Sequence, residues 1–81
     1  MKTLKKVPYS YILMEDDEGY ILTFLKGGVA ELDVTVRLNS EEMKKIENEA
    51  SYIDELVKSF LNDSSLYSDR MIFPTIWPGK N

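Results

Sequence analysis

The sequence VAELDVTVRL, residues 29–38, carries the clearest structural signal in the chain. Its even-numbered positions, from Ala30 to Leu38, are all apolar, and charged or polar residues stand between them. A period of two sustained over these residues predicts a β-strand with one buried face and one solvated face. The residues predicted on the solvated face are Glu31, Asp33, Thr35 and Arg37.

Two further strands are predicted before this one. Residues 9–14 and 20–25 are rich in aromatic and β-branched types, and Pro8 lies at the edge of the first. The acidic run at residues 15–19 predicts a hairpin loop of four or five residues, and a Lys-Gly-Gly segment at 26–28 breaks the chain again. Connections this short allow antiparallel neighbours only, so we expect a three-stranded antiparallel meander.

An amphipathic helix is predicted after the third strand. Asn39 and Glu42 have the spacing of a capping box, which favours a helix start at this point. Apolar residues then recur at intervals of three and four through about five turns. They are Met43, Ile46, Ala50, Ile53, Val57 and Phe60. We favour one long helix over residues 40–62, with a second helix capped by Ser51 as the alternative.

The predicted architecture is therefore a single small α+β domain, residues 1–81, in which one helix covers one face of the sheet. Residues 1–7 are expected to form a basic lead-in, and residues 70–73 are compatible with a short fourth strand. Pro74 and Pro78 predict an extended, irregular C-terminal tail. The core is predicted to contain Leu32, Val34, Val36, Ile46, Ile53, Val57 and Phe60.

The composition excludes several kinds of chemistry. The chain has no cysteine and no histidine, so it can form no disulfide, no thiolate or imidazole metal site and no Ser–His–Asp triad. Four consecutive carboxylates at residues 15–18 are the one group that suggests a hard cation, but the spacing of an EF-hand is absent. We therefore expect no catalytic residues, no cofactor and no metal, and a non-enzymatic protein.

The charge balance bears on partners. A formal net charge of −4 disfavours direct binding to nucleic acid and fits either simple solubility or a basic protein partner. The longest apolar stretch, residues 11–14, is far shorter than the ~20 residues of a membrane span. A chain without cysteine fits a reducing cytoplasm, and we expect a cytoplasmic protein without membrane contact.

The acidic and aromatic residues define the candidate binding surface. Trp77 lies between two prolines, so it either folds back over the open face of the sheet or remains exposed for a partner. The candidate partner-binding residues are Glu15, Asp16, Asp17, Glu18, Glu31, Asp33, Tyr67, Phe73 and Trp77. The pattern favours an inhibitor or immunity-type protein that blocks a basic partner. The alternative is a small structural or regulatory subunit that acts as a homo-oligomer, for example a homodimer through the open sheet face or an edge strand.

Overall fold

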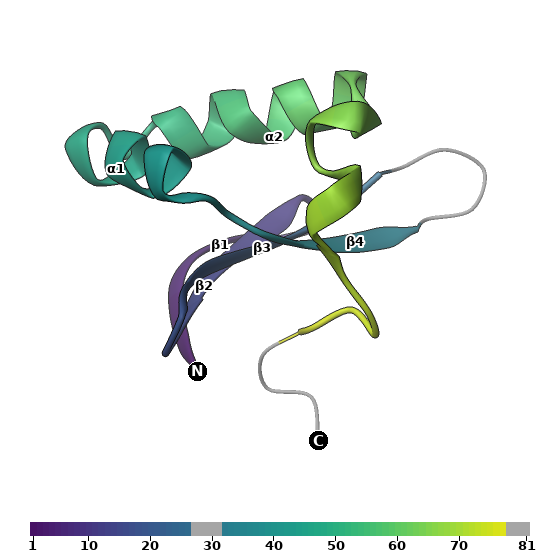
Figure 1. The fold of residues 1–81 in the computed structure, drawn as a ribbon, viewed down its shortest axis with the longest axis horizontal. Coiled ribbons are helices and arrows are strands. Elements are labelled where there is room, and N and C mark those ends of the chain that lie inside the picture. The colour runs from purple at the N-terminus through teal and green to yellow at the C-terminus, as the bar shows by residue number, and fades with distance from the viewer. Residues whose placement is uncertain (27–31, 78–81) are drawn as a thin grey trace.

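The computed structural model describes residues 1–26 and 32–77 and confirms the α+β class. A five-stranded antiparallel sheet carries two helices on one face, and the C-terminal tail passes along the other face (Figure 1). The strands lie side by side in chain order: β1 (Lys2–Val7), β2 (Tyr11–Asp16), β3 (Gly19–Leu25), β4 (Asp33–Arg37) and β5 (Met71–Ile72). The helices are α1 (Ser40–Asn48) and α2 (Tyr52–Asn62), and the short 3₁₀ turns η1 (Ser64–Leu66) and η2 (Ser68–Arg70) lead to β5.

The predicted meander is confirmed for β2, β3 and β4, but the first hairpin is tighter than expected. Asp16 pairs with Gly19, so only Asp17 and Glu18 form the turn. Gly19 adopts a φ of +132°, and an added Cβ would lie 3.0 Å from the sulfur of Met43. Glycine therefore suits this position twice, for its backbone conformation and for the close approach of α1.

The prediction that residues 1–7 form only a lead-in is wrong. β1 pairs with β2 along its whole length, with a register shift between Thr3 and Lys5. In a regular strand Leu4 and Val7, three residues apart, would lie on opposite faces. Because the irregularity breaks the period of two, both pack against the core beneath the helices. The first predicted strand also begins later than expected, because Tyr9 lies in the turn before β2 with a φ of +63° and 96% of its surface exposed.

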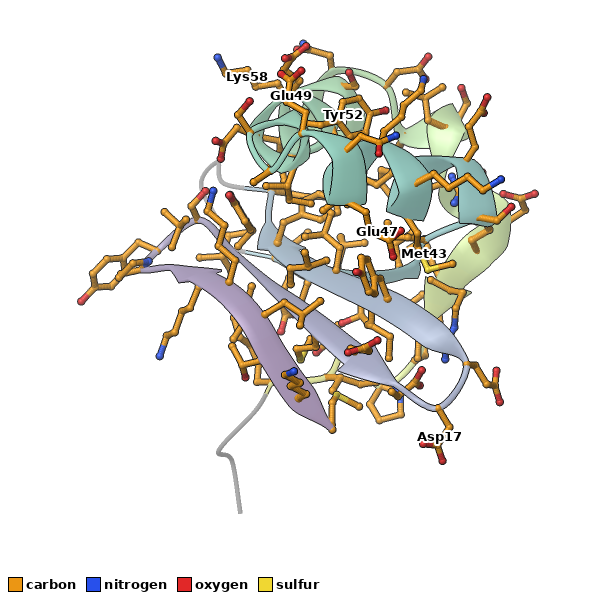
Figure 2. The ribbon with its side chains drawn as sticks, turned by 90° about the vertical axis from the view of Figure 1, so that its left-hand side faces the viewer. Asp17, Met43, Glu47, Glu49, Tyr52 and Lys58 are labelled. Atoms are coloured by element: carbon orange, nitrogen blue, oxygen red, sulfur yellow. The ribbon has the colours of Figure 1, made fainter. Side chains whose placement is uncertain are left out.

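The prediction of one continuous helix is also wrong, and the alternative of two helices is correct. Glu49 is extended (φ −144°, ψ 105°) and ends α1, while Ser51 precedes α2 without capping it through its side chain. The break lets the two helices run in different directions over the twisted sheet, so that each keeps its apolar stripe against the strands (Figures 1 and 2).

The main core lies between the helices and the sheet. Six predicted core residues are confirmed as buried: Val34, Val36, Ile46, Ile53, Val57 and Phe60. The prediction that Leu32 belongs to the core is wrong, because Leu32 precedes the first residue of β4 and 58% of its surface is exposed. Three rings form the centre of this core. Phe60 lies 5.9 Å from Phe24 and 5.1 Å from Tyr67 between ring centroids.

The second face of the sheet, the one opposite the helices, is not solvated along β4, where the alternation in residues 29–38 predicted a solvated face. Ile12, Met14 and Ile21 form a smaller apolar cluster on this face. The side chains that cover it come from the C-terminal end of the chain: Ile72, Ile76 and Trp77. Thr35, predicted to face solvent, is therefore only 1% exposed. The open face that motivated a homodimer is covered by the chain's own tail.

Candidate functional site

The C-terminal tail, residues 73–77, is attached to the second face by side chains of the sheet. After β5 the chain turns through a cis peptide bond between Phe73 and Pro74. The Thr23 hydroxyl donates to the carbonyl oxygen of Ile76 at 2.7 Å, and the amide of Ile76 donates to Thr35 Oγ1 at 2.9 Å. The two threonine oxygens are 2.8 Å apart, and since Thr23 has already given its only proton, Thr35 is the donor between them. This closed circuit satisfies both backbone groups of Ile76.

Asp33 provides the second attachment point. It is the first residue of β4 and shares the second face with Thr35, two residues along the strand. Its Oδ2 atom accepts a hydrogen bond from the Thr75 hydroxyl at 2.8 Å and another from the indole nitrogen of Trp77 at 2.5 Å. The side chain of Trp77 is thereby held in place beneath the sheet.

The tail and the end of β4 together form an open pocket of about 570 Å³, called the tail pocket below. Its lining residues are Asp33, Ile72, Phe73, Pro74, Thr75, Ile76 and Trp77. Phe73 is 74% exposed, whereas Trp77 is half-buried against the second face. The pocket thus combines a carboxylate, an exposed aromatic ring and a second aromatic ring whose position is fixed by hydrogen bonds.

We predict that Thr35→Val loosens the tail. Valine has almost the same shape but can neither accept from the Ile76 amide nor donate to Thr23, so buried polar groups lose their partners. We expect the free energy of unfolding to fall by about 1–3 kcal/mol and the fluorescence of Trp77, the only tryptophan, to shift to longer wavelength. Thr3→Val, at an exposed position of the edge strand β1, is the control, with an expected change within about 0.5 kcal/mol. Equal effects of the two substitutions would contradict the circuit.

The acidic hairpin between β2 and β3 is the second candidate region. Arg37 donates to both oxygens of Asp16, at 2.7 and 2.9 Å, and lies 3.8 Å from Glu18. The hydrogen bond from Arg37 lowers the pKa of Asp16 to about 2, and the same bond raises the pKa of Arg37. Asp16 therefore stays ionised, and Arg37 compensates its charge within the fold. The exposed carboxylates of the turn are those of Asp17 and Glu18.

The lowered pKa of Asp16 predicts a pH dependence of stability. Because the folded pKa, about 2, lies below the ordinary 3.8, the carboxylate stabilises the fold above that value. This contribution is lost as the pH falls toward 2. We expect wild type to be more stable than Asp16→Asn by a constant margin above about pH 5, with the margin shrinking below pH 4. Denaturant unfolding of both proteins from pH 7 to 2 measures this difference in stability. A margin unchanged down to pH 2 would contradict the ion pair.

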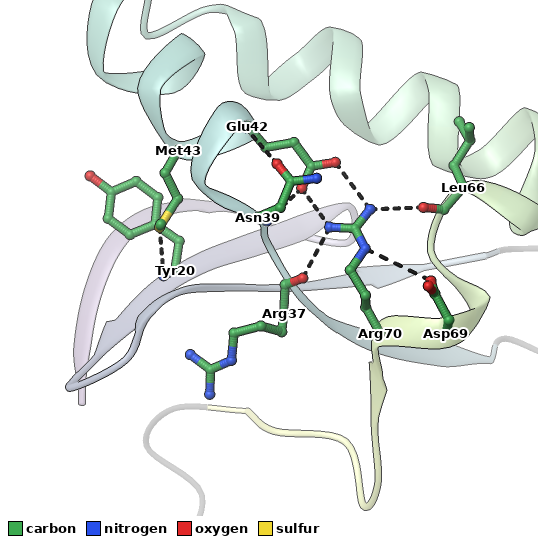
Figure 3. A network of polar contacts seen from close by, with 8 residues as sticks. All are labelled: Tyr20, Arg37, Asn39, Glu42, Met43, Leu66, Asp69 and Arg70. Carbon is green, nitrogen blue, oxygen red and sulfur yellow. Dashed lines mark hydrogen bonds and ion pairs between the residues drawn. The ribbon is translucent and has the colours of Figure 1, made fainter.

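A third region, a network of polar side chains, fixes the path of the chain into the tail (Figure 3). The predicted capping box is confirmed, with Asn39 and Glu42 each accepting from the other's backbone amide. Glu42 also accepts from Arg70 at 2.7 Å, and Arg70 donates to the backbone carbonyls of Arg37 and Leu66. Arg70 therefore ties η2, immediately before β5, to α1 and β4. This network positions the tail pocket without being part of it.

The structure gathers most of the candidate partner-binding residues at two places, the tail pocket and the acidic hairpin. Asp33, Phe73 and Trp77 all line the tail pocket, although Asp33 is distant in the sequence from the other two. A different depression, of about 520 Å³, is lined by Met1, Lys2, Glu15, Asp16 and Asp17. Glu18 lies beside it in the turn, exposed.

Tyr67 and Glu31 are the remaining candidates. Tyr67 is 1% exposed and packs edge-on against Phe24, with 5.5 Å between ring centroids. It contributes to the core rather than to the accessible surface. Glu31 lies outside the described residues.

Sequence reasoning missed the residues that build the tail pocket around those three. The sequence pattern places Thr35 on a solvated face, gives Thr23 no role and puts Thr75 in an irregular tail. The available signal was a threonine between two apolar residues in each of two neighbouring predicted strands, because a hydroxyl that becomes buried there requires a hydrogen-bond partner. The partner, Ile76, however, lies 53 residues from Thr23 and 41 residues from Thr35 in the sequence.

Within residues 1–26 and 32–77, no three carboxylates come close enough to hold a metal ion together. Among the same residues, no helix has the length and apolar character needed to cross a membrane. Comparisons with models of protein families, with curated proteins and with solved structures find no match to this chain.

Proposed function

We propose that this chain is a non-catalytic binding protein that blocks a basic protein partner, in the manner of an inhibitor or an immunity protein. The observation that carries the proposal is the common location of the tail pocket and the acidic hairpin. Asp16 and Arg37 at one end, and Asp33 at the other, share the second face of the sheet. Asp33 and Arg37 are about 13 Å apart at the usual rise per residue, a span that one partner can contact.

The charge of this surface supports a basic partner. Among the described residues, the hairpin and second face carry five carboxylates, at residues 15, 16, 17, 18 and 33, against the side-chain cations of Lys2, Lys6 and Arg37. The surface is therefore net negative, and Asp17 and Glu18 project at its tip (Figure 2 labels Asp17). Such a surface accelerates encounter with a positive partner and gives orientation more than affinity.

The tail pocket supports binding rather than catalysis. Affinity in protein interfaces comes from a few desolvated aromatic and arginine contacts surrounded by a polar rim. Phe73 and Trp77 provide aromatic surface, and the acidic hairpin provides part of the rim. As part of the same proposal the protein acts in the cytoplasm, since a domain without cysteine gains nothing from an oxidising compartment.

The proposal is tested by isolating the partner with matched variants. Immobilised wild type should retain from a lysate of the source cells a protein of net positive charge, and the purified pair should form a defined complex. The charge reversal Asp17→Lys/Glu18→Lys should weaken that complex at least tenfold. The control Asp63→Lys/Asp69→Lys, which reverses two exposed acids of the η1–η2 region, should change it less than threefold. A partner of net negative charge, or equal effects of both reversals, would overturn the proposal.

A further inference from the structure

Tyr9 is exposed in a backbone conformation that suits glycine better. It lies in the turn between β1 and β2, which the Ser10 amide closes by donating to the Val7 carbonyl at 3.1 Å. Its φ of +63° is in the left-handed region, which a residue with a Cβ atom adopts at a cost, and 96% of its surface is exposed. The ring therefore adds almost no packing to offset the strained backbone. Strain without a benefit to the fold points to a contact outside the domain.

Strand β1, which leads into this turn, is a basic edge on an acidic protein. Three of its six residues are lysines and none is acidic, whereas the whole chain has a net charge of −4. Lys5 lies 3.7 Å from Asp54, but Lys2 and Lys6 are exposed and form no ion pair among the described residues. In the described part of the chain no strand pairs with the outer side of β1. At the opposite edge, β5 has only two residues, so β1 is the longer open edge.

The lysines of β1 determine what can lie beside it. Two copies that paired through β1 would bring their lysines together, and like charges opposite each other destabilise strand pairing. Lysines on an edge strand thus protect against association with a second copy. The same electrostatic rule favours a segment whose carboxylates lie opposite the lysines. An extended segment would also pair with the open backbone groups of the edge.

From these features we propose that β1 and Tyr9 bind an extended acidic segment of a protein partner, which lies along β1 as an added strand. Carboxylates of the segment pair with Lys2 and Lys6, and an apolar side chain at its end packs on Tyr9. Tyrosine is frequent among the residues that dominate binding energy at interfaces. This contact does not depend on the basic partner proposed above, so either can fail without the other.

The test uses three blocked octapeptides at low salt. The acidic probe is Leu-Glu-Glu-Val-Val-Glu-Glu-Leu, which carries carboxylates on both faces of a strand and an apolar residue at each end. The second peptide has lysine in place of glutamate, and the third has proline in place of valine, which prevents strand pairing. We expect the acidic probe to bind about fivefold more tightly than either of the others, although the net charge of the protein opposes it. NMR shifts of the backbone amides of β1 and Tyr9 should follow this titration.

Matched charge reversals separate the edge from the rest of the surface. Lys2→Glu/Lys6→Glu should abolish the preference for the acidic probe over the lysine peptide. Lys44→Glu/Lys58→Glu changes the net charge equally, at exposed positions of α1 and α2, and should retain the preference.

Substitutions at Tyr9 test whether its ring is reserved for a partner. Tyr9→Gly should raise the midpoint of thermal unfolding by about 2–6 °C, because it relieves the left-handed strain. The same variant should bind the acidic probe about threefold more weakly than wild type. Tyr9→Phe keeps both the ring and the strain, so it should resemble wild type in both measurements. A lower midpoint for Tyr9→Gly would mean that the ring supports the fold, and the proposed contact would then be wrong.

Each remaining outcome of the peptide titration decides the proposal. If the proline peptide binds as tightly as the acidic probe, the attraction is general and no strand is added. If the acidic probe does not bind up to millimolar concentration, or binds equally to both charge reversals, β1 is not its site. A wild-type dimer with its β1 amides protected at the interface would make a second copy the occupant and overturn the proposal.

Discussion

Phe60→Ala is expected to remove most of the stability of this domain. Phe60 is 1% exposed and lies between the rings of Phe24 and Tyr67, so truncation opens a cavity where helix α2 meets the sheet. Losing a buried phenylalanine costs about 3–5 kcal/mol. A domain of this length has a total stability of about 4–12 kcal/mol. The variant is therefore expected to melt far below wild type or to be unfolded at room temperature.

The neighbouring residue gives the control for this prediction. Leu61 is 44% exposed on the same helix, so Leu61→Ala should cost less than about 1 kcal/mol. Chemical denaturation followed by circular dichroism compares the two variants with wild type. Similar midpoints for Phe60→Ala and wild type would mean that α2 does not present this side to the core.

The second large effect is expected from Glu42→Ala. This substitution removes the acceptor for Arg70 at 2.7 Å and half of the capping box at the start of α1. Arg70, whose side chain is 22% exposed, then keeps only the distant, exposed carboxylate of Asp69 to compensate its charge. Breaking such a pair from one side should cost about 2–4 kcal/mol, somewhat less than for a fully buried pair. Hydrogen exchange of the amides at residues 68–72 should also be faster in Glu42→Ala than in wild type.

Asp69→Ala is the matched control, because Asp69 is 86% exposed and reaches Arg70 only at 4.0 Å. An exposed pair of this kind contributes about 0–1 kcal/mol. If the two substitutions destabilise the domain equally, the network in Figure 3 does not hold η2 against α1. If Glu42→Ala leaves exchange at residues 68–72 unchanged, the tail is positioned by other contacts.

Local patterns in the sequence were enough to predict the α+β class, the three central strands and most of the main core. The alternation of Val34 and Val36 with polar residues, and the spacing of Ile46, Ile53 and Val57, report directly on which side each residue faces. The capping box at Asn39 was predictable for the same reason, since both partners lie within one helical turn.

The remaining features depend on contacts between distant segments. β1 was missed because three lysines and a register shift at Leu4 obscure its alternation. The solvated face was wrongly predicted because Thr35 is polar, although Ile76 covers it from 41 residues away. Asp33, Phe73 and Trp77 could each be predicted as binding residues from the sequence. That they line one pocket depends on the path of the tail, which no local pattern encodes.

We propose that the net negative surface on the second face attracts a basic partner. The most direct measurement is the association rate constant with that partner between 0.05 and 0.5 M salt. The account predicts a decrease of at least tenfold, because rising salt shortens the Debye length, about 10 Å at 0.1 M and 3 Å at 1 M. Asp17→Lys/Glu18→Lys should flatten this dependence. A wild-type rate constant that stays the same across the range would contradict the account, even if the complex itself proved stable.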